Sequence, residues 1–192
     1  MFRRSALVAA VFLVLASATA SAGGNTVHIT SSAFPASTFT GIGGDIEFSN
    51  ESGNSHTSTS DSSLYPWNKP LPPSTSASVN FPFPGAYAYH CNIHSSMHGK
   101  IRVFMERTPS SGTTATTFTV FVATAQAPTG FKFIVQRKVP GGQFRAFKST
   151  RAKQFMFHPS AAGTWAFRSR YLRNSDGAMS GWSPVLKIVV GA

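Results

Sequence analysis

The stretch YAYHCNIHSSMHGKIRV, from Tyr87 to Val103, contains the only cysteine of the 192-residue chain. Cys91 ends one strand-like run, and GKIRVF (residues 99–104) forms the next, so residues 92–98 are predicted to form a short loop. Oxidising compartments favour paired cysteines. An unpaired cysteine in this loop is therefore a metal ligand, a reactive thiol or a structural residue.

Four side chains in and near this loop have the chemistry of a copper site. Cys91, His94 and Met97 are spaced C-x2-H-x2-M, and His56 lies upstream in NSHTST. One thiolate, two imidazoles and a weak thioether suit copper, because Cu(I) favours sulfur whereas Cu(II) tolerates nitrogen donors. Zinc stays open as an alternative, although a thioether is a poor zinc ligand. A merely buried cysteine is the other alternative.

Other copper centres are excluded by what the sequence lacks. A dinuclear centre requires a second cysteine, and a multicopper oxidase requires His-x-His pairs; the chain has neither. The remaining four histidines are not expected to be ligands. His90 alternates with Cys91 on the strand and so faces the other side, His98 is expected near the surface, and His28 and His158 are expected to have structural roles.

The first 22 residues have the pattern of an export signal. Arg3 and Arg4 precede the apolar run ALVAAVFLVLA, and residues 20–22 (ASA) fit a small-residue cleavage site. The run is short for a membrane span, and no later run reaches spanning length. We therefore expect a mature chain that starts near Gly23 and is exported to the periplasm or the extracellular space.

The composition changes at ERTPSSGTTAT, residues 106–116, which predicts an exposed, flexible linker. It separates residues 23–105 from residues 117–192, and each part is long enough for one small sandwich. Residues 23–107 carry four Lys/Arg against five Asp/Glu, a net of −1, whereas residues 108–192 carry eleven against Asp176 alone, a net of +10. Nearly all of the excess charge of the mature chain therefore lies in the second part.

Short alternating runs rich in aromatic and β-branched residues predict an all-β chain. In the first part the predicted strands are TVHIT, GDIEFSN, SASVNFPF, GAYAYHC and GKIRVF. The polar stretch from Ser52 to Pro73 is predicted to be mostly irregular, with Tyr65 and Trp67 packing a loop. This pattern is typical of a Greek-key β-sandwich.

The second part repeats the pattern. Its predicted strands are TTFTVFVATA, GFKFIVQRKV, QFRAFKS, KQFMFHP, GTWAFRSRYL and SPVLKIVVGA, with a hairpin turn at VPGGQF (residues 139–144). This spacing predicts a second β-sandwich.

Residues 26–104 resemble the cupredoxins, in particular the plastocyanin and amicyanin group. GGDIEFSNESGNSH, FPFPGAYAYHC and YHCNIHSSMHGKIRV carry the resemblance. It implies a blue (type 1) copper site with His56, Cys91 and His94 as equatorial ligands and Met97 as the axial ligand. It also implies one-electron transfer, with the exposed edge of His94 as the exit. Thr57 departs from the asparagine that several relatives carry after the first histidine.

Residues 116–190 resemble a fibronectin type III domain more weakly, through the GTWAFRSRYLRNSDGAMSGWSP segment. Trp165 stands where that family usually has tyrosine. The basic residues of this part are expected to attract an acidic redox protein, an anionic membrane or an anionic envelope polymer; nucleic acid is not expected outside the cell. They are Arg137, Lys138, Arg145, Lys148, Arg151, Lys153, Arg168, Arg170 and Arg173.

The sequence thus predicts an exported blue copper protein that carries single electrons between redox partners, without enzymatic activity, and that docks through a basic module. Two alternatives stay open. In the first, copper is the cargo of a binding or delivery protein. In the second, the C-terminal module is the main function, as in an adhesion-type envelope-binding protein with an accessory copper domain.

Overall fold

The computed structural model describes residues 25–192, and every regular element in that range is a β-strand. The all-β prediction is confirmed. The predicted export signal, residues 1–22, lies outside the described residues. Between residues 25 and 192, no helix has the length and apolarity needed to cross a membrane.

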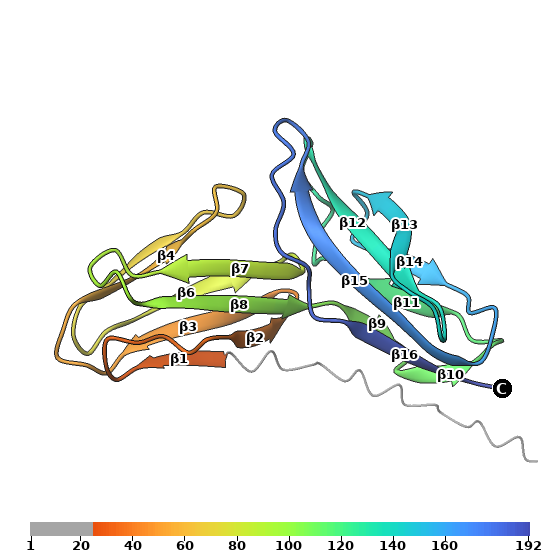
Figure 1. The fold of residues 1–192 in the computed structure, drawn as a ribbon, viewed down its shortest axis with the longest axis horizontal. Coiled ribbons are helices and arrows are strands. Elements are labelled where there is room, and N and C mark those ends of the chain that lie inside the picture. The colour runs from red at the N-terminus through yellow and green to blue at the C-terminus, as the bar shows by residue number, and fades with distance from the viewer. Residues whose placement is uncertain (1–24) are drawn as a thin grey trace, which may run out of the picture.

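The first half is a sandwich of two sheets (Figure 1). One sheet has the order β1-β3-β6, with strands Asn25–Ile29, Gly44–Asn50 and Ser76–Phe81. The other has the order β2-β8-β7-β4-β5, with strands Thr38–Gly41, His98–Phe104, Gly85–His90, His56–Ser60 and Asn68–Leu71. Both sheets contribute to one buried cluster that includes Ile46, Phe48, Tyr87, Tyr89 and Ile101.

Two strands lie where the sequence predicts irregular loop. The polar stretch between Ser52 and Pro73 contains β4 and β5, which pair antiparallel. The prediction was wrong because the buried positions of β4 are the polar His56 and Ser58, so the strand shows no alternation of apolar and polar residues. The predicted packing of Trp67 is confirmed, since its indole is buried and donates to Ser58 Oγ at 3.0 Å.

The second half contains a three-stranded and a five-stranded sheet around a second buried cluster. The smaller sheet has the order β14-β11-β9, with strands Gln154–Phe157, Phe118–Phe121 and Glu106–Thr108. The larger has the order β10-β16-β15-β12-β13, with strands Ser111–Thr113, Leu186–Gly191, Gly163–Arg173, Phe131–Lys138 and Arg145–Thr150. The predicted hairpin is present, because β12 and β13 pair antiparallel across residues 139–144.

The segment predicted to be a flexible linker, residues 106–116, contains two strands. β9 pairs antiparallel with β11, and β10 pairs parallel with β16. Just before them, Met105 is 1% exposed within the second cluster. Small polar residues are compatible with a short strand at a sheet edge as well as with a linker, and neighbouring strands decide between the two.

The two halves are in direct contact at the start of β7. Ala86 and Gly181 exchange backbone hydrogen bonds of 3.0 Å, and a Cβ placed on Gly181 would lie 2.9 Å from the Ala86 Cβ. The Phe83 ring stacks on Tyr171 at 4.4 Å between centroids. Arg173 donates across the junction to Ser63 Oγ at 3.1 Å. These contacts hold the second sandwich at the end of the first that lies away from the Cys91 loop (Figure 1).

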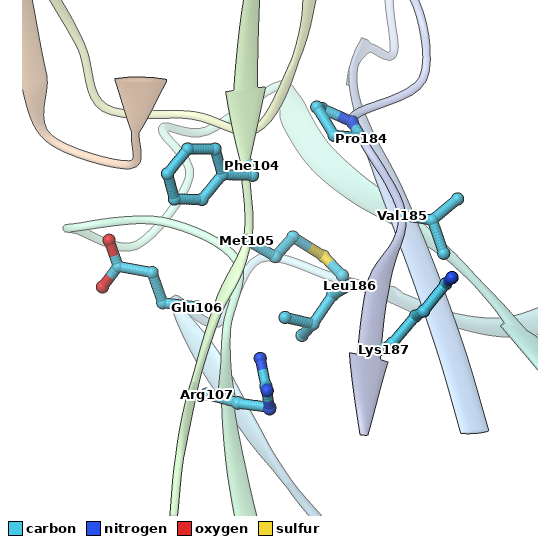
Figure 2. A pocket seen from close by; sticks show the side chains of 8 residues that line it. All are labelled: Phe104, Met105, Glu106, Arg107, Pro184, Val185, Leu186 and Lys187. Atoms are coloured by element: carbon cyan, nitrogen blue, oxygen red, sulfur yellow. The ribbon is translucent and has the colours of Figure 1, made fainter. Parts of the chain in front are cut away.

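An open groove of about 680 Å³ runs beside the crossing from β8 to β9. Figure 2 shows Phe104, Glu106 and Arg107 on one side of it and Val185 and Lys187 on the other. Its walls are the chain that connects the halves and the start of β16. None of the four predicted metal ligands lines it.

Candidate metal centre

His56 begins β4 with one ring nitrogen held and the other free. Its side chain is buried, and Nε2 lies 3.0 Å from the Ser52 hydroxyl. That hydroxyl donates to Asn50 Oδ1 at 2.8 Å, which leaves its oxygen to accept the His56 Nε2 proton. Nδ1 is then the unprotonated nitrogen. It is buried and has no hydrogen-bond partner among residues 25–192.

Asn50 holds this arrangement in place from the end of β3. Its side-chain amide donates to the carbonyls of Asn54, Leu71 and Pro72, at 2.7, 2.8 and 3.0 Å. Because Leu71 ends β5 and Pro72 follows it, the amide joins the two sheets at the end where His56 lies. Sequence reasoning missed both Asn50 and Ser52 as residues of the site. The available signal was their position within GGDIEFSNESGNSH, the quoted segment that ends at His56.

Cys91 follows β7 and is 2% exposed. Its sulfur accepts the backbone N–H of Thr57 at 3.3 Å and lies 3.7 Å from His94 Nδ1. Burial by itself would raise the pKa of this thiol. Hydrogen bonds from the backbone N–H groups of Thr57, Ile93 and His94, together with the His94 side chain, outweigh burial and lower the pKa to about 6. The protein therefore favours the thiolate, which is the form that binds metals.

The loop from Cys91 to Met97 is closed by its own backbone. The Cys91 N–H donates to the Met97 carbonyl at 3.1 Å, and the Met97 N–H donates to the His94 carbonyl at 3.0 Å. The Asn92 N–H donates to Thr57 Oγ1 at 2.8 Å, which ties the loop to β4. Thr57 thus binds the thiolate through its backbone and the loop through its hydroxyl, where the sequence left its role open.

The structure brings three of the predicted ligands together. One ligand atom from each of His56, Cys91 and His94 lies within 4.8 Å of the others, and this group of three could hold one metal ion. The fourth, Met97, is fully buried in the same loop. The free Nδ1 of His56 supports a metal here, since a buried acceptor without a partner is costly unless it binds something. One thiolate and two imidazoles fit one copper ion.

The other histidines have partners of their own, as expected of residues outside the metal group. His90 contacts Asp61, whose hydrogen bond raises the His90 pKa, and also Asn92. His28 contacts Glu51. His98 lies 2.9 Å from the Ser95 carbonyl, and His158 lies 3.0 Å from the Thr117 hydroxyl.

Comparisons with known proteins give structural likeness only. No family model matches the chain, and no curated protein matches it. Among solved structures, a reduced Cu(I) form of an amicyanin variant has 21% identity and a TM-score of 0.41, over 43% of this chain and 83% of its own. A purple cupredoxin from Nitrosopumilus maritimus has 18% identity and a TM-score of 0.38, over 42% of this chain and 99% of its own.

Proposed function

We propose that this protein is an exported carrier of single electrons, built around one copper ion that His56, Cys91 and His94 would hold, with the Met97 thioether as a further, weak ligand. The observation that carries the proposal is the group of one thiolate and two imidazoles, with Cys91 and His56 buried and His94 partly buried, in which His56 Nδ1 has no hydrogen-bond partner among residues 25–192. When bound, copper supplies a one-electron couple between Cu(I) and Cu(II).

The residues of the chain would keep the site nearly unchanged during electron transfer. Ser52 fixes the His56 ring, and the Thr57 N–H stabilises negative charge on Cys91. Burial of Cys91, His56 and Met97 excludes water. A rigid and dry set of ligands favours electron transfer, because little reorganisation accompanies the change in charge.

Electrons would enter and leave at the His94 edge. His94 is the least buried member of the group, and the neighbouring Ile93 is 56% exposed. The second half contacts the opposite end of β7 at Ala86, which is five residues before Cys91 along an extended strand, or about 17 Å. The metal end therefore stays open to a redox partner.

Copper delivery is the second candidate, and the buried ligands argue against it. A delivery protein must release its metal to a partner, whereas two of the three grouped ligands are nearly inaccessible here. Loss of copper to a modest chelator within minutes would favour delivery.

The basic second half is proposed to dock the carrier to an anionic partner. Its two sheets, of three and five strands, support the interpretation of this half as a fibronectin type III-like domain. Its excess of Lys and Arg supports attraction to negative charge.

Copper titration of the full chain tests the electron-carrier proposal. We expect one equivalent to produce an intense visible thiolate-to-Cu(II) band that ascorbate bleaches and an oxidant restores. The Cys91→Ser variant should bind copper without that band. A wild-type protein that binds copper without the band, or that does not cycle, would contradict the proposal.

A further inference from the structure

Two arginines on β15 are stacked against aromatic rings. Arg168 and Arg170 alternate with the buried Phe167, Ser169 and Tyr171, so they lie on the outer face of the five-stranded sheet. The Arg170 guanidinium lies 4.3 Å from the centre of the Trp182 ring. That of Arg168 lies 4.6 Å from Trp182 and 4.4 Å from Phe144. We call these four side chains the arginine–aromatic stack.

The aromatic rings pack against the flat faces of the two guanidinium groups. The N–H donors at the edges of these groups have few hydrogen-bond acceptors. Between residues 25 and 192, their only hydrogen bond joins Arg168 Nε to Gln136 Oε1, at 2.8 Å. Arg170 Nε is buried without a partner. Asp176, the one acid after residue 106, is bound to Arg173 instead. The terminal Nη groups of both guanidiniums make no hydrogen bond among residues 25–192, and such fixed, charged forks match the paired oxygens of carboxylate or sulfate groups.

Further cations share this face. Lys138 and Lys187 flank Ala166 on the neighbouring strands, and Lys132 pairs with Leu172. No acidic residue occurs in β12, β13, β15 or β16. Successive outward positions on a strand are about 7 Å apart. The face therefore presents a row of positive charges along β15 rather than a single pocket.

We infer that the outer face of the five-stranded sheet binds an extended anionic polysaccharide that carries sulfate or carboxylate groups. This flat array of cations suits a linear polyanion, because one extended chain can contact several of the cations at once. A membrane fits less well, because Trp182 is stacked against two guanidinium groups and is not free to insert into lipid. This inference rests on the proposed docking role, and it does not depend on copper.

The test is the affinity of the full chain for dextran sulfate, measured by calorimetry, with uncharged dextran as the control ligand. The double variant R168K/R170K keeps the net charge but loses the planar forks. We expect it to bind about tenfold more weakly. The matched variant R102K/R107K exchanges two arginines of β8 and β9, outside the five-stranded sheet of the second half, and should bind like wild type. Near-ultraviolet circular dichroism checks that each variant is folded.

Each outcome decides the inference. Equal affinity of R168K/R170K and wild type would overturn it, because net charge alone would then explain binding. Tighter binding to phosphatidylglycerol vesicles or to polyglutamate than to dextran sulfate would also overturn it, in favour of a membrane or an acidic protein. The Cys91→Ser variant should keep wild-type affinity for dextran sulfate, so failure of the copper proposal is seen separately, in the visible spectrum.

Discussion

The hydroxyl of Ser52 lies 3.0 Å from Nε2 of His56, four residues later in the chain, and thereby determines which nitrogen of that ring is free. Ser52→Ala removes the acceptor for the Nε2 proton, so the ring can adopt the tautomer that protonates Nδ1. We expect copper affinity to fall about tenfold, as for other residues that orient a metal-binding histidine. Competition with a chelator of known affinity measures the loss.

Ser55→Ala is the matched control for this prediction. Ser55 is exposed and lies in the same loop, so its variant should bind copper like wild type. If Ser52→Ala and Ser55→Ala have equal affinities, the Ser52 hydroxyl does not orient His56.

The thiol of Cys91 gives the metal-free protein a specific dependence on pH. Its pKa is lowered from 9.0 to about 6 in the folded protein. Between these values the unfolded chain binds more protons than the folded one, so stability rises with pH. The contribution of Cys91 is complete above pH 9 and is lost as the pH falls through 6. Urea unfolding of the metal-free protein across this range, compared with Cys91→Ser, isolates the contribution.

A direct titration checks the same pKa. The ultraviolet absorbance of the thiolate in metal-free protein should appear with a midpoint near pH 6. A midpoint at the ordinary value for cysteine would show that the Thr57 N–H and the loop do not stabilise the thiolate.

The sequence predicted the residues of the metal group better than the residues that hold them in position. Cys91 and His94 lie in one loop at recognisable spacing, and His56 begins a strand of the same sandwich, so local pattern was sufficient. Ser52 in the loop and Asn50 at the end of β3 are ordinary polar residues by type. The role of Asn50 arises from contacts with Leu71 and Pro72, about twenty residues away, and such contacts leave no local pattern. Ser52 acquires its role through Asn50, which accepts its hydroxyl proton.

The difference between local pattern and distant contacts also explains which strands were predicted and which were not. The strands β3 and β12 alternate apolar and polar residues and were predicted, whereas β4 buries His56 and Ser58 and was not. Residues 106–116 have the composition of a linker, but they form β9 and β10 because they pair with β11 and β16. Whether such a segment forms a strand or a loop depends on pairing with distant strands, and composition alone does not determine it.

Met97 is expected to tune the site rather than to hold it together. It is fully buried, and leucine has a similar volume, so Met97→Leu should fold with little loss of stability. Loss of the weak thioether donor disfavours Cu(II) relative to Cu(I), which should raise the reduction potential. Voltammetry of the copper-loaded variant measures the shift. An unchanged potential would show that Met97 is a packing residue and not a copper ligand.

Phe83 should couple the unfolding of the two halves. Its ring packs on Tyr171 at 4.4 Å and on Phe133 at 5.7 Å, while its backbone belongs to the segment before β7. Phe83→Ala removes most of this contact and should cost about 3 kcal/mol. Wild type should unfold in one cooperative transition, and the variant in two. Phe39→Ala serves as the control, because Phe39 is 48% exposed in the first half. A variant that still unfolds in one transition would show that the remaining bonds, from Arg173 to Ser63 and from Ala86 to Gly181, are sufficient to couple the halves.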